Sequence, residues 1–271
     1  MKFGFSTLGC PGWTLEQTVD KAQEYGYDGI ELRLLDGEVI TPASLRTNFN
    51  RIANLFGSGK PELIVLGSSV RLTAADPAER AKNEQDLLAF IEIAQELKVP
   101  LVRVFGGLLP EGTPLSVGVE RVSESLLRCA PIAERAGVTI ALETHDAFSA
   151  SSAVAAVLAK VKSSAVGALW DSHHPYRMGE AVAQVWTNLA NRLVHFHVKD
   201  AQHRPDGTWQ LVLLGEGEVP CREIVRALVM RGYHGYVVVE WEKKWHPEIE
   251  EPEVALPQHI KLMREWIADL V

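Results

Sequence analysis

The chain is poor in cysteine, and its three cysteines, Cys10, Cys129 and Cys221, lie far apart. This number and spacing exclude a CxxC zinc or redox pair and argue against a disulfide framework. No apolar run approaches the ~18 residues of a membrane-spanning helix. The opening residues, MKFGFSTLGCPGW, reach proline and glycine too early for a signal peptide. We therefore expect a soluble, reduced, cytoplasmic protein.

The chain also lacks an excess of positive charge. It has 27 Lys and Arg against 35 Asp and Glu, which gives a net charge of −8. Because nucleic-acid binders usually carry a basic surface, we expect no nucleic-acid partner. Its 271 residues, 46% of them hydrophobic, suffice for one large core or two small ones. No linker-like Gly/Ser or charged tract divides the chain, which predicts a single domain over residues 1–271.

Short apolar runs alternate with longer amphipathic stretches from end to end. The helical stretches have recognisable starts: a capping box at 14–17, and a cap residue before proline at 41–42 and 76–77. The strand candidates are residues 2–7, 29–35, 62–68, 101–107, 138–145, 165–172, 193–200 and 236–242. Eight strands alternating with eight helices require parallel strands joined by crossover helices.

Eight such repeats in about 250 residues predict a single (β/α)8 TIM barrel rather than an open doubly wound sheet. No GxGxxG motif follows the first strand, which disfavours the open dinucleotide-binding alternative. In a barrel of this kind the chemistry lies at the C-terminal ends of the strands. The polar residues at those ends are therefore the candidates for function.

The last four predicted strands each carry a carboxylate or an imidazole near the C-terminal end. These residues, in strand order, are Glu143, Asp171, His197 and Glu240. Singly, such an acidic residue is more often a helix cap or a surface ion partner, and a histidine more often a core residue. Together on adjacent strands they converge. Three carboxylates in a dry site repel one another, and a divalent cation removes that conflict. The nitrogen and oxygen donors suit Mn²⁺, Co²⁺, Mg²⁺ or Zn²⁺.

Earlier strands offer further polar residues that face the predicted cavity. Arg103 on the fourth strand, and Glu31 with Arg33 on the second, could line the cavity or form a charge network within it. The planar guanidinium of Arg103 is suited to grip a phosphate or carboxylate of a substrate. His145 shares the face of Glu143 and could contact a substrate.

The seventh strand, LVHFHVKD, holds a second group of candidates. His195 lies one layer deeper than His197, which favours a core or supporting role. Lys199, followed by Asp200, could form a structural ion pair at the barrel mouth or contact a substrate. His173, near the end of the sixth strand, has the opposite strand parity and is predicted to face away.

Two connecting segments have open interpretations. The segment GEGEVP at 215–220 could be a lid, because its glycines permit the necessary backbone turns, or an ordinary turn before a helix. The acidic segment HPEIEEPEVALP at 246–257, placed before the last helix, could cover the barrel mouth, meet a partner or form a solvated connection.

Several motifs together resemble a known family. They are LETHD around Glu143, WDSHH around Asp171, HFHVKD around His197, GEGEVP, and GYHGYVVVEWE around Glu240. The chain is similar over essentially its whole length to the xylose isomerase-like barrels, in particular the sugar phosphate isomerase/epimerase family. That family includes ketose 3-epimerases, hydroxypyruvate isomerases and inosose isomerases or dehydratases, so the motifs are poor guides to substrate.

The resemblance implies one divalent metal ion bound by Glu143, Asp171, His197 and Glu240. It also implies that Glu143 and Glu240 act as the acid/base pair on opposite sides of a substrate. His174 takes the place of the substrate-orienting histidine of the ketose epimerases.

Two family features differ in this chain. Ser149 stands where the epimerases carry a glutamate, and His203, beside Arg204, stands where they carry an arginine. The family could therefore be shared while the substrate differs from a ketose.

The expected function is metal-dependent isomerisation or epimerisation of a small-molecule carbohydrate, by proton transfer through an enediolate. Dehydration of a keto-sugar or keto-inositol on the same site is the alternative. A phosphodiesterase related to the abasic-site endonucleases would need more metal ligands on the first strands and a basic surface. A non-catalytic sugar-binding barrel would not need two opposed glutamates. Relatives are often dimers or tetramers, so a homo-oligomer is compatible with the family.

Overall fold

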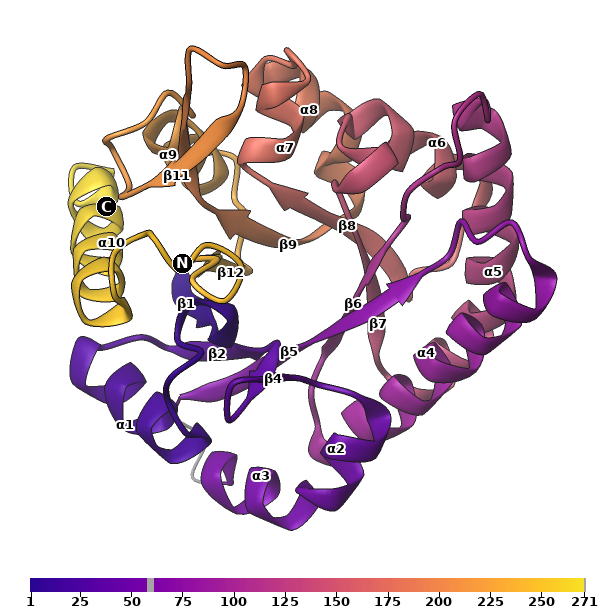
Figure 1. Cartoon of the computed structure of the whole chain (residues 1–271), viewed down its shortest axis with the longest axis horizontal. Helices are drawn as coiled ribbons and strands as arrows, with labels where there is room; N and C mark the ends of the chain where they lie inside the picture. Colours follow the sequence, from indigo (N-terminus) through magenta and orange to yellow (C-terminus); the bar gives the residue numbers. More distant parts are fainter. Residues whose placement is uncertain (58–60, 271) are drawn as a thin grey trace.

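Eight parallel strands close into a barrel in the computed structural model, which describes residues 1–57 and 61–270. Figure 1 shows the helices arranged around these strands. In order around the barrel, the strands are β1 (Lys2–Ser6), β2 (Gly29–Leu32), β5 (Glu62–Arg71), β6 (Leu101–Phe105), β7 (Thr139–Glu143), β8 (Val166–Asp171), β9 (Leu193–Val198) and β12 (Tyr236–Val239). β12 pairs with β1, so the predicted TIM barrel is confirmed. That residues 1–271 form one domain stays a prediction.

The outer layer contains more helices than the eight predicted, because two of the crossovers each contain a pair. The helices are α1 (Leu15–Tyr25), α2 (Pro42–Thr47), α3 (Phe49–Phe56), α4 (Pro77–Leu97), α5 (Leu115–Ala136), α6 (Ser151–Lys160), α7 (His173–Arg177), α8 (Val182–Leu189), α9 (Cys221–Met230) and α10 (Pro252–Ile267). Among the described residues, none of these helices combines the length and hydropathy needed to span a bilayer.

The predicted helix starts are present. Thr14 Oγ1 accepts a hydrogen bond from the Gln17 backbone, and the Gln17 side chain accepts one from Thr14, which completes a capping box. Gly26 ends α1 in the left-handed region, at φ +80°. Such reciprocal caps satisfy backbone groups that a helix end leaves unpaired.

The two faces of the strands separate the outer apolar core from the polar groups inside the barrel. Alternate residues such as Leu142, Trp170 and Phe196 are buried in the main cluster between the strands and the helices. A small separate cluster of Ile64, Val65 and Val238 fills part of the barrel interior. This interior packing leaves the C-terminal ends of the strands to hold polar side chains.

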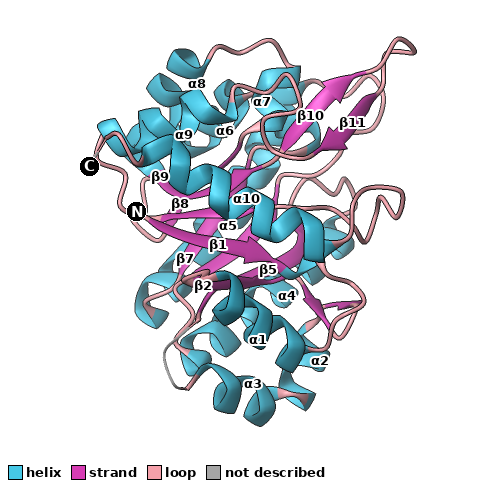
Figure 2. Ribbon diagram, turned by 90° about the vertical axis from the view of Figure 1, so that its left-hand side faces the viewer, coloured by secondary structure: helices cyan, strands magenta, loops and turns pink. Residues whose placement is uncertain are grey.

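Two short hairpins extend the strand ends. β10 (Asp200–His203) and β11 (Trp209–Val212) pair antiparallel after β9 and project beyond the barrel in Figure 2. β3 (Leu34–Leu35) and β4 (Glu38–Val39) pair after β2. The expected seventh strand therefore ends two residues early, at Val198, and Asp200 begins the hairpin.

The acidic segment 246–257 is only partly a connection. Its last residues form the first turns of α10, which begins at Pro252, so the prediction that the whole segment precedes the last helix is wrong. The remainder is fastened by the buried Lys243, whose ammonium donates to the carbonyl oxygens of Pro247 and Ile249. This part of the chain is tied to its own backbone rather than freely solvated.

Candidate metal centre and active site

The four predicted metal ligands lie together at the C-terminal ends of adjacent strands. Glu143 ends β7, Asp171 ends β8, His197 lies on β9 and Glu240 follows β12. Parallel pairing places Asp171 beside His197 and Val238 beside His197, which fixes these ends at one level. One donor atom from each of the four lies within 4.8 Å of the others. All four side chains are buried.

Each glutamate divides its two oxygens between the cluster centre and a buried cation. Glu143 Oε1 lies 3.1 Å from Nδ1 of His197, and Glu143 Oε2 accepts a 2.8 Å hydrogen bond from Arg103. Glu240 Oε1 lies 3.3 Å from the same Nδ1, and Glu240 Oε2 accepts a 2.6 Å hydrogen bond from Lys199. The two carboxylates are therefore oriented in the same way by different cations.

These cations control the ionisation of the glutamates. Burial acts to raise the pKa of Glu240, but the charges of Lys199 and His197 outweigh it and hold that pKa well below its usual range. Glu143 follows the same pattern, with burial opposed by the charge of Arg103, and its pKa is also lowered. Both glutamates are therefore carboxylates at neutral pH in the metal-free protein.

Asp171 differs from the two glutamates. Its Oδ1 accepts hydrogen bonds from the backbone N–H groups of His173 and His174, at 2.8 and 2.9 Å. Its Oδ2 is buried and has no hydrogen-bond partner among the described residues; the ammonium of Lys199 lies 3.3 Å away. Burial raises the pKa of Asp171 to about 6, against the opposing charge of Lys199.

A divalent cation fits this arrangement. The unpartnered Asp171 Oδ2, one oxygen from each glutamate and Nδ1 of His197 form a buried set of oxygen and nitrogen donors. Such a set suits Mn²⁺, Co²⁺, Mg²⁺ or Zn²⁺. The structure brings the predicted ligands together, and their role as ligands stays a prediction.

The outer nitrogen of His197 has a carboxylate partner on the far side of the barrel. Nε2 of His197 lies 2.8 Å from Oε2 of Glu31, which is buried on β2. Histidines that bind metals commonly donate their second ring N–H to a carboxylate, which fixes the tautomer and the ring orientation. Of the two interpretations left open for Glu31, the charge network is the one found. His195 is buried and packs edge-to-face on His197, with the ring centroids 5.2 Å apart, and its supporting role stays a prediction.

Lys199 lies within the cluster itself. Its ammonium contacts Asp171, Glu240 and Glu242, and the side chain is only 1% exposed. The sequence pattern predicts an ion pair at the barrel mouth or a substrate contact for Lys199, and Glu242 is not among the predicted site residues. Glu242 has the same strand parity as Glu240, two residues earlier, and that signal could have found it. Whether Lys199 also contacts a substrate stays a prediction.

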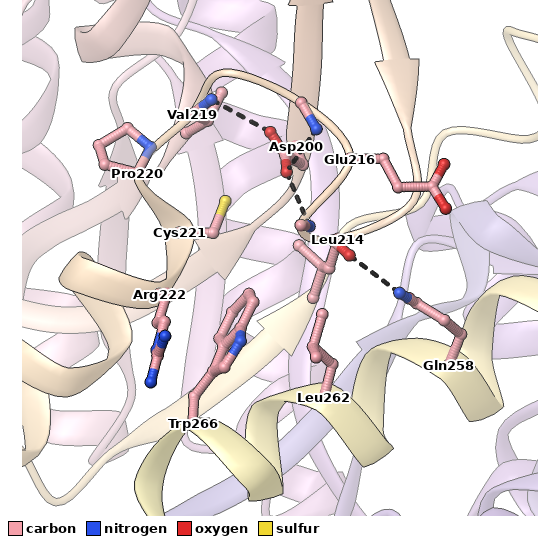
Figure 3. Close-up of a pocket in the computed structure, with 12 residues that line it drawn as sticks. Asp200, Leu214, Glu216, Val219, Pro220, Cys221, Arg222, Gln258, Leu262 and Trp266 are labelled. Atoms are coloured by element: carbon pink, nitrogen blue, oxygen red, sulfur yellow. Dashed lines mark hydrogen bonds between the residues drawn. The ribbon is translucent and has the colours of Figure 1, made fainter.

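Asp200 fastens the segment 215–220 instead of pairing with Lys199. Its carboxylate accepts hydrogen bonds from the backbone N–H groups of Gly215, Gly217 and Val219, some of which Figure 3 shows. A pocket of about 530 Å³ lies between this segment and α10, and none of the four cluster residues lines it. The segment is therefore a turn that hydrogen bonds to Asp200 fix beside the barrel. These contacts do not support its interpretation as a lid.

A row of aromatic rings adjoins the cluster. The rings of Phe105 and His145 lie 4.5 Å apart, and those of His145 and His174 also lie 4.5 Å apart. Both ring nitrogens of His174 are buried without a hydrogen-bond partner in the described part of the chain, so they can serve a bound molecule. His173 begins helix α7, where strand parity no longer applies, and its ring packs on Trp209. Substrate contacts by His145, His174 and Arg103 stay predictions.

The fold and the buried cluster define a parallel barrel with a carboxylate–histidine centre at its C-terminal face. The family model described as a xylose isomerase-like TIM barrel matches residues 19–266, and the chain belongs to that family.

Curated relatives include sugar-modifying enzymes. A fructoselysine 3-epimerase of Shigella flexneri is 26% identical over 250 residues, which cover 89% of this chain and 90% of the relative. An inosose dehydratase of Geobacillus kaustophilus is 23% identical over 292 residues, which cover 96% of this chain and 88% of the relative. The relatives thus span two reaction types.

Solved structures share the fold over nearly their whole length. The IOLI protein with a bound zinc atom superposes with a TM-score of 0.85 at 20% identity, covering 100% of this chain and 99% of the other. A D-tagatose 3-epimerase-like protein gives a TM-score of 0.80 at 20% identity, covering 100% and 98%. At these identities the likeness shows the fold.

Proposed function

We propose that the protein is a divalent-metal-dependent isomerase or epimerase that moves a proton on the carbon next to the carbonyl of a small carbohydrate. The observation that carries this proposal is the matched pair of glutamates. Glu143 and Glu240 each direct one oxygen toward the cluster centre, and each is fixed through its other oxygen by a buried cation. A sugar-binding barrel without catalysis has no need of two ionised bases directed at one centre.

A divalent cation bound here would supply a Lewis acid for the substrate carbonyl. Glu143, Asp171, His197 and Glu240 would hold it. One glutamate accepts the substrate proton and one glutamate returns a proton, as general base and general acid. Return to the opposite face gives epimerisation, and return to the adjacent carbon gives aldose–ketose isomerisation.

Arg103 and Lys199 orient the bases. Because each binds the outer oxygen of a glutamate, the inner oxygen is the one available at the centre. Nε2 of His174 lies 3.9 Å from Oδ1 of Asp171, and neither ring nitrogen has a hydrogen-bond partner in the part of the chain that the structure describes, which suits His174 to orient a substrate hydroxyl. The buried surroundings exclude water, which strengthens each of these electrostatic contacts.

Dehydration is the second candidate. The inosose dehydratase relative covers nearly the whole chain. Ser149 and His203 also replace a glutamate and an arginine that are typical of the ketose 3-epimerases. Loss of a β-hydroxyl after the same proton abstraction would give a dehydrated product, so the bases would be unchanged and the product would differ.

A phosphodiesterase has less support. Within the described residues, strands β1, β2, β5 and β6 carry no histidine. Further metal ions would need ligands there, and the chain's net charge of −8 does not favour a polyanionic substrate.

Proton exchange tests the proposal. The protein loaded with Mn²⁺ or Co²⁺ is placed in D₂O with ketoses, hydroxypyruvate and keto-inositols, and deuterium entry next to the carbonyl is followed by NMR. We expect exchange that disappears after chelation and in Glu240→Gln. Glu248→Gln, the same change at an exposed site, should retain it. A metal-loaded protein that binds a sugar from the panel without exchanging any C–H proton would contradict the proposal.

A further inference from the structure

Arg33 follows a strand on the opposite side of the barrel from Asp171. It follows β2 by one residue and lies two residues past Glu31, so it is on the same face one layer higher. β2 and β8 are four strands apart in the closed ring of eight, which puts them on opposite sides. The negative charges of Glu31, Glu240 and Glu143 all act on Arg33, and that of Glu31 acts most strongly.

Within the described residues, every hydrogen-bond partner of Arg33 is a neutral group. Its backbone N–H donates to Thr7 Oγ1 at 2.9 Å. Its Nη1 donates to the carbonyl oxygen of Gly67 at 3.0 Å and to Ser69 Oγ at 2.7 Å. These contacts fix the orientation of the guanidinium and leave its Nε and Nη2 edge without an acceptor among the described residues.

Arg33 also lacks a counter-ion. The residue is 7% exposed, yet within the described ranges 1–57 and 61–270 it forms no ion pair with a carboxylate. The other buried cations of the site are paired, Arg103 with Glu143 and Lys199 with Glu240. Burial, aided by the charge of Arg103, lowers the pKa of Arg33 to about 9. A buried guanidinium without an anion is costly unless a ligand supplies one.

Arg103 adds a second buried positive charge close to Arg33. A methyl group on Gly67 would lie 3.3 Å from Cδ of Arg33, 3.4 Å from Nη2 of Arg103 and 3.3 Å from Oε1 of Glu31. The two arginines therefore approach each other over Gly67. Nε and Nη2 of Arg103 are buried without a hydrogen-bond partner in the described chain. Glu31 offsets part of this charge from below, where its Oε2 is engaged by His197.

We propose that Arg33, supported by Ser69, binds an anionic substituent of the substrate, a carboxylate or a phosphate. The proposal rests on the proposed function for the position of the reacting carbons, and it narrows the substrate to an acidic or phosphorylated hydroxy-ketone. The free Nε and Nη2 edge of a guanidinium matches two oxygens of such a group. Arg103, already bound to Glu143, adds charge behind Arg33 and is not needed as a direct contact.

Three small probes that share one enolisable HOCH₂–C=O unit separate the contributions. They are dihydroxyacetone, which is neutral, hydroxypyruvate, which carries a carboxylate, and dihydroxyacetone phosphate. Deuterium entry at the hydroxymethyl carbon is measured in the Mn²⁺-loaded protein. A charge-assisted contact predicts a kcat/KM for an anionic probe about 10- to 100-fold above that for dihydroxyacetone. The anionic probe with the higher kcat/KM shows whether Arg33 binds a carboxylate or a phosphate.

Variants of Arg33 test whether this residue causes the preference for the anionic probe. Arg33→Gln should remove the preference for the anionic probe, so that its kcat/KM falls to that of dihydroxyacetone measured in the same variant. Arg33→Lys keeps the positive charge but lacks the two-nitrogen edge of a guanidinium. It should therefore keep part of the higher kcat/KM for the anionic probe. Arg71→Gln is the matched control, because Arg71 is exposed and pairs with Asp146. An equal loss for all three probes in Arg33→Gln would mean a structural role and overturn the proposal, as would the absence of any anionic preference in the wild type.

A binding measurement separates this proposal from the proposed function. Inorganic phosphate is titrated calorimetrically into the Mn²⁺-loaded wild type, Arg33→Gln and Arg71→Gln. We expect affinity to fall about 10-fold or more in Arg33→Gln only. Equal affinities would overturn the anion site. Loss of affinity without proton exchange on any probe would leave the anion site standing while the isomerase function fails.

Discussion

Oε2 of Glu31 lies 2.8 Å from Nε2 of His197, on the opposite side of the imidazole from Nδ1 and the other three cluster residues. In the metal-free protein burial acts to lower the pKa of His197, but the charges of Glu31 and Glu240 outweigh it and hold that pKa well above its usual range, so the ring is charged. Once the ring loses its Nδ1 proton and still donates from Nε2 to Glu31, it presents the Nδ1 lone pair to the cluster centre. Glu31 therefore selects the tautomer that a metal ion needs, although it is not among the four predicted ligands.

Glu31→Gln tests this relationship. We expect the affinity for Mn²⁺ to fall about 10- to 100-fold, since the outer partners of metal-binding histidines contribute on that scale. The measurement is a calorimetric titration of the chelator-treated protein. Glu248→Gln, at an exposed site, should leave the affinity unchanged. An unchanged affinity in Glu31→Gln would show that the strand itself fixes the ring.

The contacts of Lys199 predict that metal binding compensates for its loss in the stability of the protein. Its ammonium contacts three carboxylates, those of Asp171, Glu240 and Glu242. In Lys199→Met the metal-free protein should lose about 3–5 kcal/mol, the usual cost of removing one partner from a buried ion pair. A divalent cation can replace the missing charge, so Mn²⁺ should raise the melting temperature more in the variant than in the wild type.

The check is a pair of thermal melts for each protein, with chelator and with saturating Mn²⁺. Lys261→Met is the matched control, because Lys261 is exposed and its nearest carboxylate, Glu265, lies 4.0 Å away. If Lys199→Met lowers the melting temperature equally in both conditions, the ammonium does not share its carboxylates with the metal site.

The turn fastened by Asp200 gives a steric prediction. A Cβ on Gly217 would lie 2.2 Å from Oδ1 of Asp200 and 2.6 Å from the carbonyl oxygen of Ala201. Gly217→Ala must therefore displace the segment 215–220 or break its hydrogen bonds. We expect a loss of about 1–3 kcal/mol in unfolding free energy. Gly12→Ala, where nothing lies within 4 Å, is the control. Equal stability of both variants in urea titrations would contradict the rigid turn.

The sequence was sufficient to predict the barrel and the four cluster residues. Strand parity and a position near the C-terminal end follow from local pattern, and in a closed parallel barrel these two facts place Glu143, Asp171, His197 and Glu240 at one centre. Those residues needed no knowledge of distant contacts beyond the closure of the sheet.

Other features depend on tertiary partners and could not be read from local pattern. Asp200 accepts from backbone groups fifteen or more positions away, which no spacing rule indicates. His173 begins a helix, with only Ser172 between it and the end of β8, so strand parity does not set the direction of its side chain. The lack of a counter-ion for Arg33 becomes visible only when every neighbouring carboxylate has a known position. Glu242, in contrast, could have been predicted, because the strand parity that identified Glu240 applies equally to a residue two positions later.

His259 on α10 predicts a pH dependence remote from the active site. The ring is fully buried against Trp241, and its Nδ1 contacts the carbonyl oxygen of Ala255. Burial lowers the pKa of His259 to about 4 from 6.5, against the smaller effect of the Ala255 hydrogen bond. Between these values the unfolded chain binds a proton that the folded protein does not, so stability falls as the pH drops through 6.5 toward 4.

Urea unfolding of the metal-free protein at pH 7 and pH 5 measures this effect. His259→Gln should reduce the difference in unfolding free energy between the two pH values by about 2 kcal/mol, because one proton is no longer taken up preferentially by the unfolded chain. His234→Gln, at an exposed position, should retain the full difference. The same pH dependence in His259→Gln as in the wild type would show that the other buried histidines account for it alone, since His173, His174 and His195 also have a lowered pKa through burial.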